Sequence, residues 1–371
     1  MNHSDPIVRR LHACIVAGVA TNLVGAPGVG KTARVLAYVK AQKGAMERMI
    51  LSRCEPIDLK VRLNHEGKVV VVDAPEIERA ARAGLAGVLS IIFFDELNRA
   101  ERSTEGAALD IIDAPPAGVA VVAACNPPTK GQASRPLSSA AANRFCHLFV
   151  EADGRGWCDA QLTGWPIAGA VSGPDPDALA KAKERTSVLV SAFIRSNMAL
   201  LECEPDNALD AGGPWPSPRT WEAVKRVHAV AIALGYDFDD IEALISGCVG
   251  KGAATSYMAY VIDAGTLDPE VVLADPEGWT PEAGKLDRTI VLVTGIVGCV
   301  ARDMTADRWE AAWKVLGRCE ACNESAAGMV GTDLLIGVER SVGARMKGLK
   351  SSAALMAKHT PRVAAAHASA I

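Results

Sequence analysis

The stretch "GAPGVGKT", Gly25 to Thr32, decides the fold that this sequence predicts. It fits the phosphate-loop pattern G-x-x-x-x-G-K-[ST], in which glycines let the backbone turn successive N–H groups towards phosphates. A short apolar run precedes it and a helical pattern begins near Lys31, so the positive end of a helix adds to the attraction for anions. We therefore expect a nucleotide-binding site here rather than a chance glycine-rich turn.

Each part of this loop has an expected task. The Lys31 ammonium would reach the outer phosphates of the nucleotide, and the Thr32 hydroxyl would ligate Mg²⁺. The residues expected to contact the nucleotide are Gly25, Ala26, Pro27, Gly28, Val29, Gly30, Lys31, Thr32 and Ala33. The loop alone does not say what the bound nucleotide is used for, because kinases, GTPases, helicases and ring-shaped motors share it.

An acidic pair follows a second apolar run, in "IIFFDELNRA" from Ile91 to Ala100. Asp95 and Glu96 come directly after four apolar residues, at the carboxyl edge of an expected buried strand, where open α/β sheets bind ligands. Asp95 is expected to hold Mg²⁺, directly or through a water molecule, and Glu96 to act as general base on the attacking water. A GTPase would use a glutamine there, so the pair favours ATP hydrolysis. The alternative is that both residues only cap the next helix.

The composition is that of a globular protein with a substantial core. The chain has 371 residues, which suggests about two domains, with 49% hydrophobic and 22% charged residues. Its net charge of -4 gives no general attraction to nucleic acid or to acidic membranes. No apolar stretch reaches about 18 residues, and the first residues lack the apolar core of a secretion signal. We therefore expect a cytoplasmic protein without a membrane segment, whose 10 cysteines are reduced.

Short apolar runs alternate with helical patterns in the first part of the chain, which predicts an α/β core. The expected strands are residues 21–24, 48–52, 69–72, 91–94, 119–124 and 146–150. From Asp177 onwards the pattern is helical, and Ser217 is an expected N-cap. Residues 263–284 are rich in turn-forming residues and are expected to be a linker. The expected domains are an ATPase core over 1–160, a helical lid over 161–262, and a linker with a helical C-terminal domain over 263–371.

The motif order "GAPGVGKT … FFDELNRA … VVAACNPP … AANRF … PSPR" resembles the MoxR-like branch of the AAA+ ATPases, over about residues 11–261. The acidic pair followed by Asn98 and Arg99 is the most specific part of this resemblance. It implies an AAA+ P-loop core, with a five-stranded parallel sheet between helices, an α-helical lid and an α-helical C-terminal extension.

The resemblance also implies roles for three later residues. Asn126 corresponds to the first sensor, which orients the attacking water. Arg144 corresponds to the arginine finger, which would enter the ATP site of a neighbouring subunit, and Arg219 corresponds to the second sensor in the lid. Taken singly, each arginine could be a solvated surface charge and Asn126 a turn residue. A finger acting on a neighbour implies a homo-oligomeric ring, most simply a hexamer.

Three features depart from this family. Only "DAPPAG" separates the helix after the acidic pair from the next strand, which leaves no room for the β-hairpin that relatives carry there. Residues 54–84 are longer than a strand–helix–strand unit needs and resemble an insertion with one candidate strand, 69–72. The extension beyond Ala264 has no chemistry that the sequence assigns. The first departure puts substrate threading in doubt.

Two further motifs are weak. Cys319 and Cys322 form one C-x-x-C pair without a second pair nearby, so a zinc site is not favoured. The glycine-rich stretch around Lys251 lacks the preceding strand and the Lys-Ser/Thr step of a second nucleotide site.

The family suggests a chaperone-like remodeller that activates a partner, in relatives often a protein with a von Willebrand factor A domain. One alternative is a nucleic-acid motor of restriction or replication type, which the negative net charge and the lack of a DNA-reading module disfavour. Another is an ATP-dependent switch or scaffold with little turnover. The sequence does not identify the client.

Overall fold

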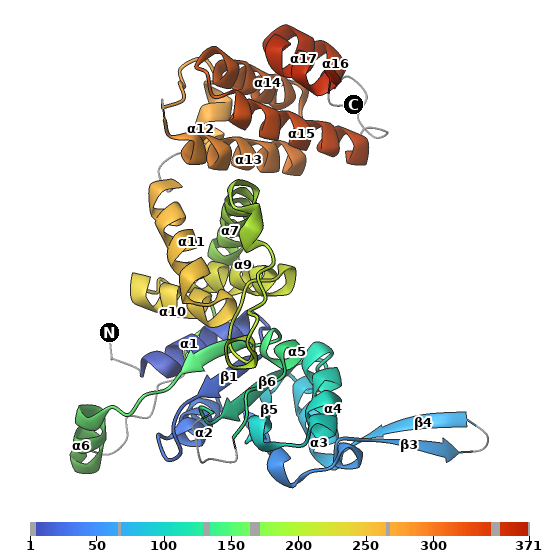
Figure 1. Cartoon of the computed structure of the whole chain (residues 1–371), viewed down its shortest axis with the longest axis vertical. Helices are drawn as coiled ribbons and strands as arrows, with labels where there is room; N and C mark the ends of the chain where they lie inside the picture. Colours follow the sequence, from blue (N-terminus) through green and yellow to red (C-terminus); the bar gives the residue numbers. More distant parts are fainter. Residues whose placement is uncertain are drawn as a thin grey trace. The chain divides into compact units, whose positions relative to one another are not determined.

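The computed structural model describes residues 5–65, 68–128, 134–163, 171–264, 268–282, 284–342 and 349–369 (Figure 1). The chain divides into two compact units that do not follow chain order. Unit 1 comprises Met1–Lys183 and Ala199–Thr255, and unit 2 comprises Glu184–Met198 and Ser256–Ile371. The long helix α7 (Pro176–Ser196) and the helix α11 (Lys251–Ala264) each contribute residues to both units.

Unit 1 is built on a five-stranded parallel sheet, as predicted. Its strands are β1 (Thr21–Val24), β2 (Ala45–Ile50), β5 (Ser90–Asp95), β6 (Val119–Cys125) and β7 (Cys146–Phe149). They pair in parallel in the order β2-β5-β6-β1-β7. Every residue of β5 is buried, which explains why its sequence is a continuous apolar run rather than an alternating one.

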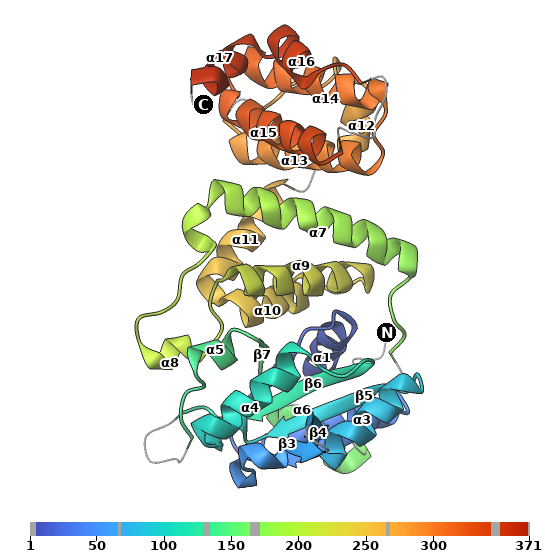
Figure 2. The ribbon, with the colours of Figure 1, turned by 90° about the vertical axis from the view of Figure 1, so that its right-hand side faces the viewer.

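Helices pack on both sides of this sheet. Along the chain, α2 (Lys31–Ala41) follows β1, α3 (Pro75–Leu85) precedes β5, and α4 (Arg102–Asp113) lies between β5 and β6. The helix α1 (Pro6–Val16) lies between the sheet and the pair α9 (Pro218–Ala233) and α10 (Phe238–Val249), as Figures 1 and 2 both show. Short elements complete unit 1: η1 (Leu51–Arg53), η2 (Pro56–Asp58), η3 (Leu97–Arg99), α5 (Ser139–Ala142), α6 (Gly154–Thr163), η4 (Met198–Leu200, shared with unit 2) and α8 (Ala208–Ala211).

The predicted cap of α9 is confirmed. The Ser217 hydroxyl accepts a hydrogen bond from the Thr220 N–H, and the Thr220 hydroxyl accepts one from the Ser217 N–H. These reciprocal bonds satisfy backbone donors that a helix start otherwise leaves unpaired. Pro218 at the first helical position agrees with the same start.

The insertion after β2 contains two strands where the sequence predicted one. Strands β3 (Lys60–His65) and β4 (Lys68–Asp73) form an antiparallel hairpin, with Lys60 opposite Asp73 and His65 opposite Lys68. Figure 1 shows this hairpin projecting beyond α3 and α4. Between α4 and β6, residues 114–118 form no strand, so the expected absence of a hairpin at that position is confirmed.

Unit 2 has a helical core of its own. The helices α12 (Pro269–Ala274), α13 (Leu286–Arg302), α14 (Ala306–Ala321), α15 (Ser325–Val342), α16 (Ser352–His359) and α17 (Pro361–Ser369) form most of it. Trp309 and Trp313 are buried at its centre, and Val272 and Leu273 of α12 belong to the same cluster. Part of the stretch expected to be a linker is therefore a packed helix. Within the residues that the structure describes, no helix is both long and apolar enough to cross a membrane.

The buried His147 on β7 makes the stability of unit 1 depend on pH. Its Nε2 donates to the Ala142 carbonyl at 2.9 Å, and its Nδ1 accepts from the Asn22 amide at 3.3 Å. Burial lowers the pKa of His147 to about 4, and the hydrogen bond to Ala142 opposes that shift. In the unfolded chain the imidazole has a pKa of about 6.5, so between these values only the unfolded form takes up the proton.

We therefore expect the free energy of unfolding to fall as the pH is lowered through this window. From pH 7 to pH 5, His147 should account for about 2 kcal/mol of the loss. Urea denaturation of the wild type and of His147→Gln at both pH values measures this difference. Equal losses in the two proteins would show that His147 is not the group responsible.

Candidate active site

The strand order places three polar segments at one edge of the sheet. Strand β6 pairs with β1 on one side and with β5 on the other, all in parallel, so their carboxyl ends lie together. The phosphate loop follows β1, Asn126 follows β6, and Asp95 is the last residue of β5. Segments far apart in the sequence thus meet at one place.

Glycine is required in the loop for two different reasons. A Cβ atom on Gly25 would lie 2.4 Å from the Val150 carbonyl oxygen, so no side chain is accommodated there. Gly30 has a φ of +87°, a left-handed conformation that other residues rarely adopt. Gly30 also precedes α2, and no side chain caps this helix start. The first N–H groups of α2 therefore remain available for an anion.

The Lys31 ammonium lies at the centre of the site. It donates to the carbonyls of Gly25 at 2.6 Å and Ala26 at 3.1 Å, and to the Asn126 side-chain oxygen at 2.9 Å. Burial lowers the pKa of Lys31, while the charge of Asp95 opposes that shift. A partly desolvated ammonium that is held only by neutral oxygens gains most from an anionic partner.

Arg34 holds the phosphate loop through hydrogen bonds, and no sequence motif indicated this residue. Its guanidinium donates to the Val29 carbonyl at 2.6 Å and to the Asp5 carboxylate at 2.5 Å. Asp5 also accepts from the Ile7 N–H as the N-cap of α1. Arg34 therefore connects the loop to the start of the N-terminal helix.

Asp95 and Thr32 form a pair of oxygen ligands suited to Mg²⁺. The Thr32 hydroxyl lies 3.5 Å from Asp95 Oδ2, and both side chains carry the hard oxygen atoms that Mg²⁺ prefers. Asp95 Oδ2 also accepts from Arg48 Nε at 3.0 Å and from Arg48 Nη2 at 2.5 Å. The donor set fits the metal, and Arg48 is a cation beside it that the sequence did not indicate.

Glu96 follows in an unusual backbone conformation. Its φ of 56° and ψ of 36° are left-handed, which is costly for a residue with a side chain. Its two carboxylate oxygens are both engaged, one by the Ser52 hydroxyl and the other by Arg99 Nη1 at 3.0 Å. The strand ends at Asp95, and two side chains fix the position of the Glu96 carboxylate.

Asn98 connects the acidic turn to Asn126. It is buried, and its amide nitrogen donates to the carbonyls of Asn126 at 2.7 Å and Arg135 at 3.0 Å. The Asn126 N–H lies 3.3 Å from Asn98 Oδ1. Asn126 is thus held through its backbone on both sides, which leaves its side chain to contact Lys31. The sequence indicated Asn98 only by resemblance and gave it no such contact.

The two arginines lie on connected segments of the chain. Asn143, next to Arg144, accepts from the Ser217 hydroxyl at 2.8 Å, and Ser217 lies two residues before Arg219. Arg144 forms an ion pair with Asp113 through two hydrogen bonds of 2.8 and 2.7 Å. Arg219 is exposed in the first turn of α9. In the described part of the chain, no hydrogen bond or ion pair joins either arginine to the phosphate loop.

The structure thus brings together Lys31, Thr32, Asp95 and Asn126 through direct contacts, with Glu96 beside them. Of the remaining loop residues, Ala26, Pro27, Gly28 and Ala33 are exposed, Val29 and Gly30 are partly buried, and Gly25 is buried.

Removing the Asn98 amide should destabilise unit 1, because it leaves partly buried backbone carbonyls of Asn126 and Arg135 without this donor. For Asn98→Ala we expect the free energy of unfolding to fall by about 2 kcal/mol. Asn207→Ala, which removes an exposed helix cap, is the matched control and should cost less. Urea denaturation measures both, and a loss for Asn98→Ala no larger than the control's would contradict this assignment.

Residues 21–145 match the family described as AAA domain (dynein-related subfamily). No curated protein matches the sequence of the chain. Among solved structures, a candidate ATPase from Cytophaga hutchinsonii is similar over 65% of this chain and 79% of its own, with 18% identity and a TM-score of 0.42. A full-length MCM homolog from Methanopyrus kandleri is similar over 70% of this chain and 56% of its own, with 15% identity and a TM-score of 0.38.

The sequence match covers the phosphate loop, the acidic pair, Asn126 and Arg144. The segment 21–145 is therefore an AAA domain.

Proposed function

We propose that the chain binds ATP with Mg²⁺ at the carboxyl edge of β1, β6 and β5 and hydrolyses it to ADP and phosphate. The observation that carries this proposal is the contact of Lys31 Nζ with Asn126 Oδ1 at 2.9 Å, beside the Thr32–Asp95 pair. It unites the phosphate loop, the expected metal ligands and the expected sensor in one place. The match to an AAA domain supports the same activity.

Binding would use the loop and its helix. The free N–H groups at the start of α2 and the Lys31 ammonium would hold the outer phosphates. Thr32 and Asp95 would hold Mg²⁺, which when bound would neutralise charge on the phosphate oxygens. Lys31 would exchange its carbonyl partners in the loop for phosphate oxygens, a stronger charge-assisted contact.

Hydrolysis would use Glu96 as general base. Glu96 would accept a proton from a water molecule while the water oxygen bonds to the γ-phosphorus and the bond from that phosphorus to the bridging oxygen breaks. The electron pair of the broken bond would leave with ADP. Glu96 would first exchange its contact with Ser52 or Arg99 for the water, and Asn126 would orient that water.

We further propose that Arg144 acts on the site of a neighbouring copy, so that the active form is a ring, most simply a hexamer. Arg144 is held by Asp113, whose side chain is 42% exposed, and the guanidinium would exchange this partner for a phosphate of a neighbour. Arg219 would report the nucleotide state to the helices around α9. The link from Asn143 to Ser217 would transmit a shift of one arginine to the other.

The proposed biological role is that of a chaperone-like remodeller or activator of a partner complex, as the MoxR-like motif order suggests. A partner with a von Willebrand factor A domain is one candidate. The short connection between α4 and β6 argues against threading of a substrate through the ring. DNA-stimulated turnover would instead favour a nucleic-acid motor, and turnover near zero a switch or scaffold.

For Glu96→Gln we expect ATP binding to persist and hydrolysis to fall by at least about a hundredfold, because the amide cannot accept the proton. Lys31→Ala is the matched control and should weaken nucleotide binding itself. Calorimetry measures binding, and phosphate release measures turnover. If Glu96→Gln turned over ATP at the wild-type rate, Glu96 would not be the base.

Mixing two inactive variants tests whether Arg144 acts on a neighbour. Arg144→Ala and Glu96→Gln should each be inactive alone, with a loss of about a thousandfold for Arg144→Ala. Mixed rings contain sites with an intact Glu96 facing an intact Arg144, so mixing should restore part of the turnover. Asp113→Asn keeps Arg144 and should stay active. Restored activity is expected only if Arg144 acts on the site of a neighbouring copy. If mixing restores no activity, Arg144 acts on the site of its own copy or on no site.

A further inference from the structure

The register of β2 against β5 places a basic side chain next to the metal site. Arg48 lies opposite Phe93 and Ile50 lies opposite Asp95, so Arg48 and Asp95 are diagonal neighbours on the same face of the sheet. Arg48 reaches Asp95 with two N–H groups, from Nε at 3.0 Å and from Nη2 at 2.5 Å. The Asp95 side chain is only 12% exposed, so the carboxylate end of this ion pair is largely shielded from solvent, whereas the Arg48 end is not.

Both N–H groups of Arg48 converge on one oxygen of Asp95. That oxygen, Oδ2, is also the one that faces the Thr32 hydroxyl. The other oxygen, Oδ1, accepts from the Glu96 N–H at 3.0 Å. The carboxylate therefore has no unengaged oxygen on the side of Thr32. A metal ion held directly by both Thr32 and Asp95 would use Oδ2, because that oxygen faces the Thr32 hydroxyl.

We propose that Arg48 is a displaceable counter-cation of Asp95, which competes with Mg²⁺ for Oδ2 and raises the metal concentration that the site requires. Two cations repel each other at one oxygen, so Arg48 must withdraw when the metal binds there. Metal alone would bind weakly against this competitor. Nucleotide phosphates add ligands and negative charge, so metal would enter together with nucleotide. This inference rests on the proposed function, because it concerns the metal of that same site.

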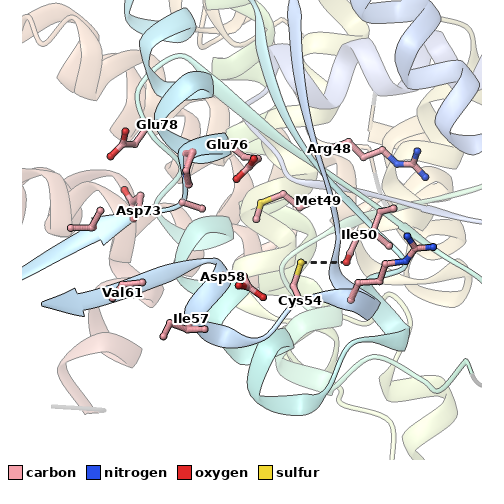
Figure 3. A pocket seen from close by; sticks show the side chains of 14 residues that line it. Arg48, Met49, Ile50, Cys54, Ile57, Asp58, Val61, Asp73, Glu76 and Glu78 are labelled. Carbon is pink, nitrogen blue, oxygen red and sulfur yellow. Dashed lines mark hydrogen bonds between the residues drawn. The ribbon is translucent and has the colours of Figure 1, made fainter.

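Arg48 has a place to which it can withdraw. Its side chain is 46% exposed, and it lines a cleft between the end of β2 and the start of α3. Figure 3 shows Asp73, Glu76 and Glu78 across this cleft from Arg48, whose guanidinium points away from them. Because its side chain is partly exposed, a guanidinium released from Asp95 would remain in contact with water.

Binding of Mn²⁺, followed by electron paramagnetic resonance of the free ion, tests the proposal without any turnover. The metal is titrated into the full chain with saturating ADP and without nucleotide. For Arg48→Gln we expect the Mn²⁺ dissociation constant in the presence of ADP to fall roughly tenfold below the wild-type value, because the competing charged hydrogen bonds are gone. Arg48→Lys keeps the positive charge but lacks the paired N–H groups of the guanidinium. Its Mn²⁺ dissociation constant should lie between those of the wild type and Arg48→Gln.

Arg79→Gln is the matched control. Arg79 pairs with Glu47 of the same strand through bonds of 3.1 and 2.8 Å and has no bond to Asp95. Its removal should leave the Mn²⁺ dissociation constant unchanged. An unchanged Mn²⁺ dissociation constant in Arg48→Gln would overturn the proposal. Weaker Mn²⁺ binding in that variant would also overturn it, because Arg48 would then support metal binding. If Arg48→Gln does not fold, Arg48→Lys decides in the same way, since wild-type affinity there would overturn the proposal.

A separate measurement distinguishes this inference from the proposed function. Fluorescent ADP is titrated into the wild type and Lys31→Ala in the presence of a metal chelator. If ADP does not bind, or binds equally well without Lys31, the proposed function fails. If ADP binding depends on Lys31 but the Mn²⁺ affinity does not depend on Arg48, only the inference fails.

Discussion

The parallel pairing of β6 with both β1 and β5 is the constraint on which the site depends. In a parallel sheet the carboxyl ends of neighbouring strands lie at one edge, so the residues that follow them are neighbours regardless of their distance in sequence. Residues 25, 95 and 126 are brought together in this way, with no need for a specific loop path. The loops and helices then only adjust side chains that the sheet has already assembled.

A second property of the site is that its charged groups already have partners in the chain. Lys31 is held by loop carbonyls and Asn126, Asp95 by Arg48, and Glu96 by Ser52 and Arg99. Each contact is one that a phosphate, a metal ion or a water molecule would have to replace. Ligand binding is therefore an exchange of hydrogen bonds, and its net free energy is the difference between the bonds lost and the bonds gained.

Much of this could be predicted from the sequence, because the decisive signals are local. The glycine pattern, the apolar run before Asp95 and the cap at Ser217 each lie within a few residues, and the structure has them where expected. The strand β3 was missed because "KVRLNH" carries polar and charged residues and gains its strand character by pairing with β4. Arg48, Arg34 and the bridging bonds of Asn98 were missed since they depend on strand register and on contacts across the fold. The helix α12 was also missed, because residues typical of turns surround it in the sequence.

The left-handed backbone of Glu96 has a consequence for how sequences of this kind can change. A glycine or asparagine at that position would adopt the same conformation with less strain, a relief of about 1 kcal/mol or more. Backbone strain alone would therefore favour losing the carboxylate, at the cost of its bonds to Ser52 and Arg99. If the chain keeps Glu96 despite this strain, it accepts a loss of folding stability at one residue in return for the chemistry proposed for its carboxylate. Under the proposed function, variants without this glutamate would be binding proteins that hold nucleotide without hydrolysing it.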